Sequence, residues 1–102
     1  MRKEIGMNII INDQAAAWYK REMDLKLGDF VRFYVRYGGC STVQSGFSLG
    51  ISTEEPTDAA VKTEKDGITF YIEEKDVWYF DGHDLSVSFH EQADEPVFNY
   101  DK

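Results

Sequence analysis

Residues 30–37 read Phe-Val-Arg-Phe-Tyr-Val-Arg-Tyr, and their side chains alternate between two faces of an extended chain. One face carries Val31, Phe33, Val35 and Tyr37, and the other carries Phe30, Arg32, Tyr34 and Arg36. This period of two predicts a half-buried β-strand. A second alternating run covers residues 47–52, after a loop that contains Gly38-Gly39-Cys40-Ser41. We therefore expect the two strands to pair across that loop.

The rest of the chain predicts one helix and further strands. Ile9–Ile11 is a short β-branched strand, and Asn12 is a suitable cap for an amphipathic helix from Asp13 to about Met23. The sequence also predicts a hairpin at 61–72 around Asp66-Gly67, a helical turn at 73–80 ended by Asp81-Gly82, a strand at 85–90 and an edge strand at 96–102. The predicted class is α+β: a mainly antiparallel β-sandwich or partly open barrel with one N-terminal amphipathic helix.

Length, charge and cysteine content limit the class of protein. With 102 residues, a single domain over 1–102 is expected, with residues 1–7 as an extra N-terminal segment and either Met1 or Met7 as the start. The net charge of −8 excludes nucleic acid as a partner, because phosphates would be repelled. One cysteine favours a reducing compartment, and no apolar run is long enough to cross a membrane. A cytoplasmic protein is therefore expected.

Three motifs identify a family that the chain resembles. They are the Gly38–Ser41 loop, Gly46-Phe47-Ser48-Leu49-Gly50 on the following strand, and Tyr79-Phe80-Asp81-Gly82 before a late strand. In this order they resemble the HesB-like domain, the core domain of iron-sulfur cluster biosynthesis, from about Asn8 to Phe98. The stretches Asp29–Phe33 and Tyr37–Ser41 look like those of the YneR-type subgroup. The resemblance implies a HesB-like fold.

The A-type carriers of that family have three cysteines tied to iron and cluster binding, and only the first matches a residue here, Cys40. At the place of their C-terminal Cys-Gly-Cys, this chain has Phe98-Asn99-Tyr100-Asp101. Iron-sulfur clusters are usually held by four thiolates, so one cysteine per chain cannot enclose one. The resemblance therefore implies iron or an iron-sulfur cluster bridged between chains in a homodimer.

Two interpretations of function stay open. The first is a non-catalytic accessory of iron-sulfur cluster assembly or iron handling, with assembly or recipient proteins as partners. The second is a protein-binding adaptor module that kept the HesB-like fold but lost metal binding. The sequence shows no acid–base pair, nucleophile cluster or phosphate loop, so an enzyme is not expected.

The candidate site residues are few. Cys40 is the candidate metal ligand, and His83, between carboxylates in Asp81-Gly82-His83-Asp84, is a weaker one, ahead of His90. Arg32, Tyr34 and Arg36 form a basic and aromatic strip for an anionic ligand or an acidic partner, unless they pair with acids of neighbouring strands.

Two further groups have a default structural interpretation. The acids Glu73, Glu74 and Asp76 suggest either a hard-cation site or, as the simpler interpretation, a solvated face at a helix start. Trp18 and Trp78 are expected in the core, as large aromatic side chains usually are, with an interface as the minor alternative for either of them.

Overall fold

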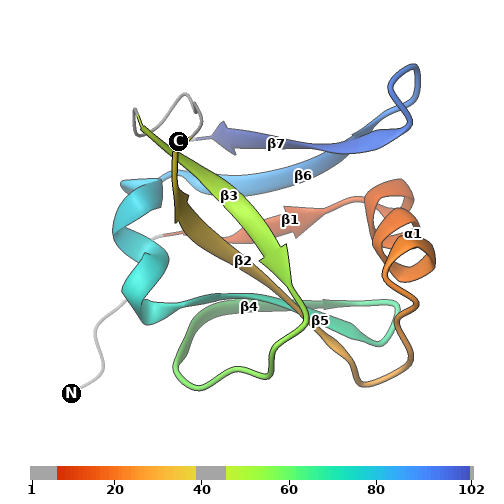
Figure 1. The fold of residues 1–102 in the computed structure, drawn as a ribbon, viewed down its shortest axis with the longest axis horizontal. Helices are drawn as coiled ribbons and strands as arrows, with labels where there is room; N and C mark the ends of the chain where they lie inside the picture. The colour runs from red at the N-terminus through yellow and green to blue at the C-terminus, as the bar shows by residue number, and fades with distance from the viewer. Residues whose placement is uncertain (1–6, 39–45, 102) are drawn as a thin grey trace.

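The computed structural model describes residues 7–38 and 46–101, and the elements follow the predicted order (Figure 1). Their bounds are β1 Ile9–Ile11, α1 Asp13–Glu22, β2 Phe30–Tyr37, β3 Phe47–Ser52, β4 Ala59–Lys65, β5 Ile68–Glu73, the 3-10 helix η1 Glu74–Phe80, β6 Asp84–His90 and β7 Glu95–Asp101. Each predicted strand is present, and the predicted helical turn at 73–80 is η1.

The strands of the described ranges form two sheets, ordered β1-β6-β7 and β3-β2-β5-β4. The pairs β1–β6 and β2–β5 are parallel, whereas β2–β3, β4–β5 and β6–β7 are antiparallel. The expected pairing of β2 with β3 is confirmed, and Tyr37 lies opposite Phe47. The two mixed sheets do not close into a barrel, so the sandwich form of the predicted α+β class is the one observed.

The core lies between the two sheets and is rich in aromatic rings. Phe33 of β2 stacks on Phe70 of β5 with 6.0 Å between centroids, and it meets Phe98 of β7 edge-on at 5.7 Å. Tyr19 of α1 adds a third contact to Phe33 at 6.1 Å. The alternation in β2 thus buries Val31 and Phe33 completely, as the sequence predicts.

Helix α1 closes one end of the sandwich. Asn12 caps it as expected, because its Oδ1 accepts a hydrogen bond from the Ala15 amide at 2.8 Å. The helix ends at Glu22, and Asp24 then takes a left-handed conformation with φ +52°. No helix within residues 7–38 and 46–101 is long and apolar enough to span a membrane.

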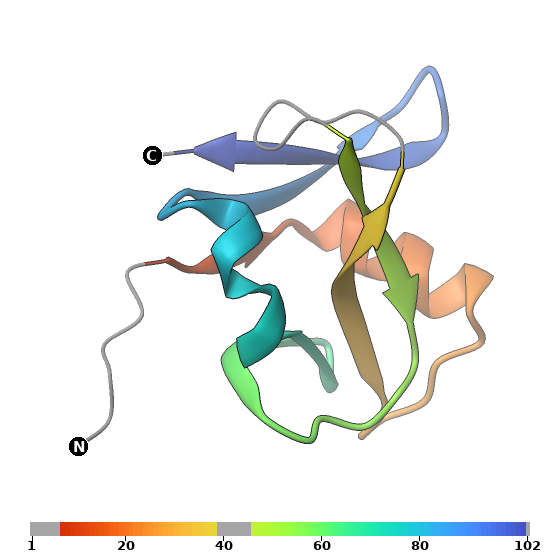
Figure 2. The same cartoon turned by 60° about the vertical axis from the view of Figure 1, so that its left-hand side comes forward.

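The 3-10 helix η1 lies at the other end and connects β5 of one sheet to β6 of the other. Figure 2, in which η1 comes forward, shows this connection running between the two layers. Tyr79 and Phe80 are fully buried and fix η1 to the core. Asp81 follows in a left-handed conformation, φ +48° and ψ +43°, so the helix ends at Asp81-Gly82 as predicted.

Two expectations about buried residues need correction. Met7, predicted to belong to an extra N-terminal segment, is 4% exposed and packs in the core, whereas residues 1–6 lie outside the described ranges. Trp78, expected in the core, is 51% exposed. Trp18 is half-buried, and its indole N–H donates to the Asp94 carbonyl at 3.1 Å.

Candidate functional site

Arg32, the first residue of the predicted basic strip, is held by acids of its own chain. Its Nη2 lies 2.9 Å from Oδ2 of Asp76 on η1, and its Nη1 lies 3.4 Å from Oε1 of Glu54. The guanidinium also lies 5.5 Å from the centroid of the Tyr34 ring. Only 14% of the Arg32 side chain is exposed. The pairing with nearby acids that the sequence allowed is therefore present at this position.

The electrostatics of Arg32 are set by two opposing effects. Burial alone would lower its pKa, but the hydrogen bond and the negative charge of Asp76 raise it, with smaller contributions from Glu54 and Glu73. The net result is a raised pKa, so the guanidinium is charged at neutral pH. Arg32 thus ties β2 to η1.

Glu73, the last residue of β5, is a buried carboxylate with its own donors. Its Oε1 accepts from the Thr57 hydroxyl at 2.5 Å and from the Thr57 amide at 3.2 Å, and its Oε2 accepts from the Asp58 amide at 3.0 Å. Burial alone would raise the pKa of Glu73. These hydrogen bonds and the charge of Arg32 lower the pKa by more, so it lies below the ordinary value of 4.5. The carboxylate therefore anchors the β3–β4 connection beside the start of η1.

These contacts overturn the sequence interpretation of the acids at 73–76. Glu73 is 5% exposed and Asp76 is 7% exposed, so neither belongs to a solvated face. The hydrogen bonds that their carboxylates accept come from the chain itself, including Arg32 and Thr57. Only Glu74 is exposed as predicted.

Tyr34 and Arg36 complete the predicted strip, because they alternate along β2 on the same face as Arg32. Tyr34 is half-buried, and its ring covers Gly50 of β3, where an added Cβ would lie 2.4 Å from the ring carbon Cζ. Arg36 is exposed. The strip therefore has two parts: Arg32 and Tyr34 are engaged with their own chain, and Arg36 reaches solvent.

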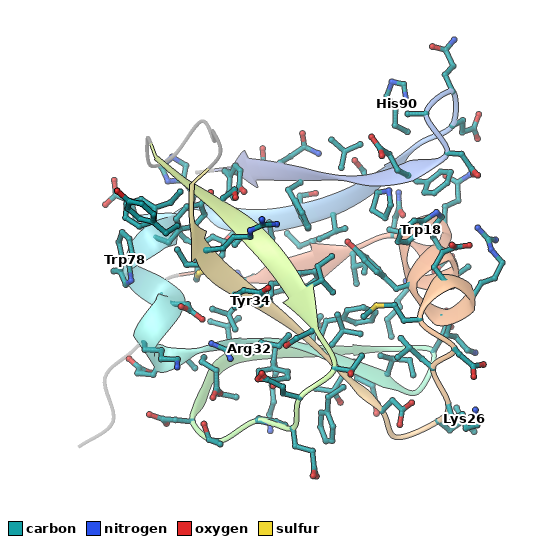
Figure 3. The ribbon with its side chains drawn as sticks, viewed as in Figure 1. Trp18, Lys26, Arg32, Tyr34, Trp78 and His90 are labelled. Atoms are coloured by element: carbon teal, nitrogen blue, oxygen red, sulfur yellow. The ribbon has the colours of Figure 1, made fainter. Side chains whose placement is uncertain are left out.

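The two histidines lie far apart on the fold. The Nδ1 of His83 lies 2.8 Å from the Phe80 carbonyl oxygen, so this nitrogen must carry the hydrogen. The neighbouring Asp84 accepts from the Asn8 amide at 2.8 Å. His90 is exposed, and its Nδ1 accepts from the Ala93 amide at 3.0 Å (Figure 3).

Cys40 lies outside the described residues. The described base of its loop is closed by a hydrogen bond from the Gly38 amide to the Gly46 carbonyl at 2.7 Å, and the Ser48 hydroxyl donates to the Gly38 carbonyl at 3.1 Å. Across residues 7–38 and 46–101, no three His, Cys, Asp or Glu side chains come close enough together to hold a metal ion. Any metal contact of Cys40 stays a prediction.

The structure adds one feature that the sequence analysis missed, which we call the aromatic surface and define as Tyr37, Phe47 and Trp78. The Tyr37 and Phe47 rings meet edge-to-face with centroids 5.6 Å apart, and Phe47 and Trp78 do the same at 5.3 Å. Tyr37 is 89% exposed and Trp78 is 51% exposed. The surface joins the ends of β2 and β3 to η1.

A signal for this surface was present in the sequence. A 3-10 helix has three residues per turn, so Lys75 and Trp78 share one face of η1. A lysine on the same face as a tryptophan indicates that this face meets solvent. Tyr37 also precedes Gly38 directly, at the end of the strand, where the alternation no longer guarantees burial.

The whole described chain matches one family model. The model is described as iron-sulphur cluster biosynthesis, and it matches residues 7–102. The resemblance to the HesB-like domain is thereby confirmed.

Two relatives are similar to the chain over most of its length. The chain is 64% identical over 94 residues to a protein of Bacillus subtilis (strain 168) named pyruvate dehydrogenase inhibitor, covering 92% of this chain and 99% of the relative. It is 38% identical over 92 residues to an uncharacterized protein of Staphylococcus saprophyticus, covering 87% of this chain and 94% of the relative.

Two solved structures share the fold. Escherichia coli SufA, described as involved in biosynthesis of iron-sulfur clusters, aligns with a TM-score of 0.61 at 18% identity, covering 91% of this chain and 78% of SufA. A protein from Aquifex aeolicus aligns with a TM-score of 0.55 at 20% identity, covering 100% of this chain and 99% of that protein. At these identities the likeness concerns the fold alone.

Proposed function

The chain belongs to the iron-sulphur cluster biosynthesis family, and we propose that this member is a non-catalytic protein ligand that binds pyruvate dehydrogenase and lowers its activity. The observation that carries the proposal is the 64% identity, over nearly the full length of both chains, to a relative named for that inhibition. This function is a specific form of the adaptor interpretation that the sequence left open.

The small number of metal-ligating side chains supports a protein-binding role. The sequence contains one cysteine, so each chain offers at most one thiolate, whereas an iron-sulfur cluster is usually held by four. The described residues bring no set of three other metal-ligating side chains together. One chain therefore lacks the ligands that a carrier of clusters needs for a closed site.

The way η1 is held supports the same role. A binding surface is most effective when it is ordered before the partner arrives, because ordering costs free energy on binding. Here Asp76 ties η1 to Arg32 of β2, the Glu74 amide donates to the Asp58 carbonyl at 2.9 Å, and Tyr79 and Phe80 are buried. Side chains on the outer face of η1 are thus presented on a fixed support.

The direct test is inhibition of a purified enzyme. The Bacillus subtilis pyruvate dehydrogenase complex is assayed by its rate of NADH formation while the purified chain is added over a range of concentrations. We expect a saturable fall in rate that is unchanged by iron chelators and by Cys40→Ser. The proposal is wrong if the chain leaves the rate unchanged at a large molar excess while binding of the two proteins is also absent.

Family membership favours a second candidate, a cluster or iron carrier in which Cys40 of two chains bridges the cargo. Anaerobic incubation of the chain with iron and sulfide, followed by an absorption spectrum, an iron assay and a measurement of oligomeric state, tests it. Visible absorption and a dimer that are both lost in Cys40→Ser would favour this candidate. A colourless monomer that behaves like Cys40→Ser would exclude it.

A further inference from the structure

The aromatic surface is unusual because two of its three large rings are exposed to solvent. Tyr37 is 89% exposed, although it lies on the same face of β2 as the buried Val31 and Phe33. Trp78 is 51% exposed on a helix whose neighbouring residues Tyr79 and Phe80 are fully buried. Clustered exposed aromatic residues of this kind mark interaction sites.

The rings are held in place by contacts behind them. Phe47, between Tyr37 and Trp78, is half-buried and packs against the core. Trp78 meets Tyr79 edge-to-face at 6.2 Å, and the Tyr79 hydroxyl lies 3.3 Å from the Tyr100 hydroxyl. The surface therefore combines exposed rings with a fixed backing, which is the arrangement of a preformed anchor.

The kind of residue indicates the kind of contact. Tyrosine and tryptophan are enriched at the centres of protein interfaces, because they bury a large area at a small cost in side-chain entropy. Phe47 also begins β3, an edge strand whose residues Phe47–Ser52 carry no charge. A partner that covers the rings can thus extend along β3 without desolvating a charged side chain of that strand.

Charge distinguishes between two kinds of partner. The net charge of the chain is −8, so two copies repel each other, which disfavours a homodimer at this surface. Around η1, among residues 7–38 and 46–101, the acids outnumber the exposed bases Lys75 and Arg36. These acids are Glu74, Asp81, Asp84 and Asp101, on η1 or on the strand ends beside it. A partner with a basic rim around an apolar pocket fits this distribution.

We propose that the aromatic surface is the docking site of the chain, and that Tyr37 and Trp78 insert into an apolar pocket with a basic rim on pyruvate dehydrogenase. This inference rests on the proposed function and adds to it the surface and the chemistry of the partner. It assigns binding to the outer face of η1 and to the ends of β2 and β3, away from Arg32 and the buried carboxylates.

The test compares variants in the same inhibition assay. Tyr37→Ser, Trp78→Ser and the double variant remove the rings, and Leu27→Ser is the matched control, because Leu27 is 79% exposed. Its neighbour Lys26 lies at the opposite end of the molecule from Trp78 (Figure 3). We expect each single variant to need about thirtyfold more protein for half-inhibition, as for a hot-spot residue, and the control to match the parent. Added salt should weaken inhibition by the parent.

The outcomes separate the two proposals. If the parent inhibits and the double variant inhibits equally well, the aromatic surface is not the docking site and the proposed function stands. If the parent neither inhibits nor binds the enzyme, both proposals are wrong. Circular dichroism and urea unfolding establish that each variant is folded. If size-exclusion chromatography shows a parental dimer that dissociates in the double variant, a second copy occupies the surface, and the inference is overturned.

Discussion

On the inner face of η1, Asp76 is 7% exposed and binds Arg32 at 2.9 Å, whereas on the outer face Trp78 is 51% exposed and lies against Phe47. Folding alone would favour the opposite arrangement, since burying charge is costly and burying an aromatic ring is favourable. The two faces therefore have different roles. The inner face fixes η1 in position through Asp76 and the buried rings of Tyr79 and Phe80, and the outer face carries the docking site that we propose.

The largest expected effect is on the inner face. Asp76→Ala leaves the Arg32 guanidinium largely buried without its main carboxylate, so we expect a loss of about 3 kcal/mol in the free energy of unfolding. Urea denaturation at neutral pH measures it. Glu54→Ala is the control, because Glu54 is 58% exposed and only 3.4 Å from Arg32; it should cost less than about 1 kcal/mol. Equal losses in the two variants would show that η1 is not held by the Arg32–Asp76 pair.

A smaller effect is expected at Glu73, and it depends on pH. Because the folded-state pKa of Glu73 lies below its ordinary value, its ionised form stabilises the fold above that ordinary value, and this contribution is lost as the pH falls through the folded-state pKa. Glu73→Gln should cost about 1 to 2 kcal/mol at neutral pH.

The parent should also lose stability from about pH 5 downward more steeply than Glu73→Gln does. Urea denaturation at several pH values compares the two slopes. Parallel curves for parent and variant would contradict the assigned role of Glu73. Glu74→Gln is the matched control, because Glu74 is exposed one residue away.

The outer face should contribute least to stability. Tyr37→Ser is expected to change the free energy of unfolding by less than about 0.5 kcal/mol, since the side chain is 89% exposed. Trp78→Ser should cost about 1 kcal/mol, because only half of that side chain leaves water on folding. Urea denaturation measures both. A loss as large as that of Asp76→Ala would mean that the rings are structural, and the contrast between the two faces would disappear.

The smallest signal is spectroscopic. Iodide quenches exposed indoles, so tryptophan fluorescence should be quenched more strongly in Trp18→Phe, which keeps Trp78, than in Trp78→Phe, which keeps the half-buried Trp18. Unfolding both variants in urea should remove the difference and serves as the control. Stronger quenching of Trp18 than of Trp78 in the folded proteins would place Trp78 in the core, as the sequence first suggested.

The parts of the fold that could be predicted are those with a clear local sequence pattern. Strand β2 matched its predicted bounds, because alternation over eight residues has one simple interpretation, and the Asp66-Gly67 turn fixed the β4–β5 hairpin. The parallel pairs β1–β6 and β2–β5 have no such signal, since their partners are distant in sequence.

The candidate site was harder to predict for a related reason. From the sequence alone, Glu73 and Asp76 resemble solvated acids, because their partners are distant along the chain. Thr57 lies 16 residues from Glu73, and Arg32 lies 44 residues from Asp76. Tryptophan is expected in the core by default, with an interface as the minor alternative, so residue type alone does not predict that Trp78 is exposed. Only the three-dimensional arrangement brings Tyr37, Phe47 and Trp78 together.

The central claim is that the outer face of η1 and the ends of β2 and β3 form the contact with pyruvate dehydrogenase. Hydrogen–deuterium exchange, followed by mass spectrometry on the chain with and without the enzyme complex, tests it most directly. Docking at this surface predicts slower exchange on binding in peptides that cover residues 46–52 and 74–82, and no change in a peptide that covers residues 24–29. Protection confined to residues 24–29, or no protection anywhere at saturating enzyme, would contradict it.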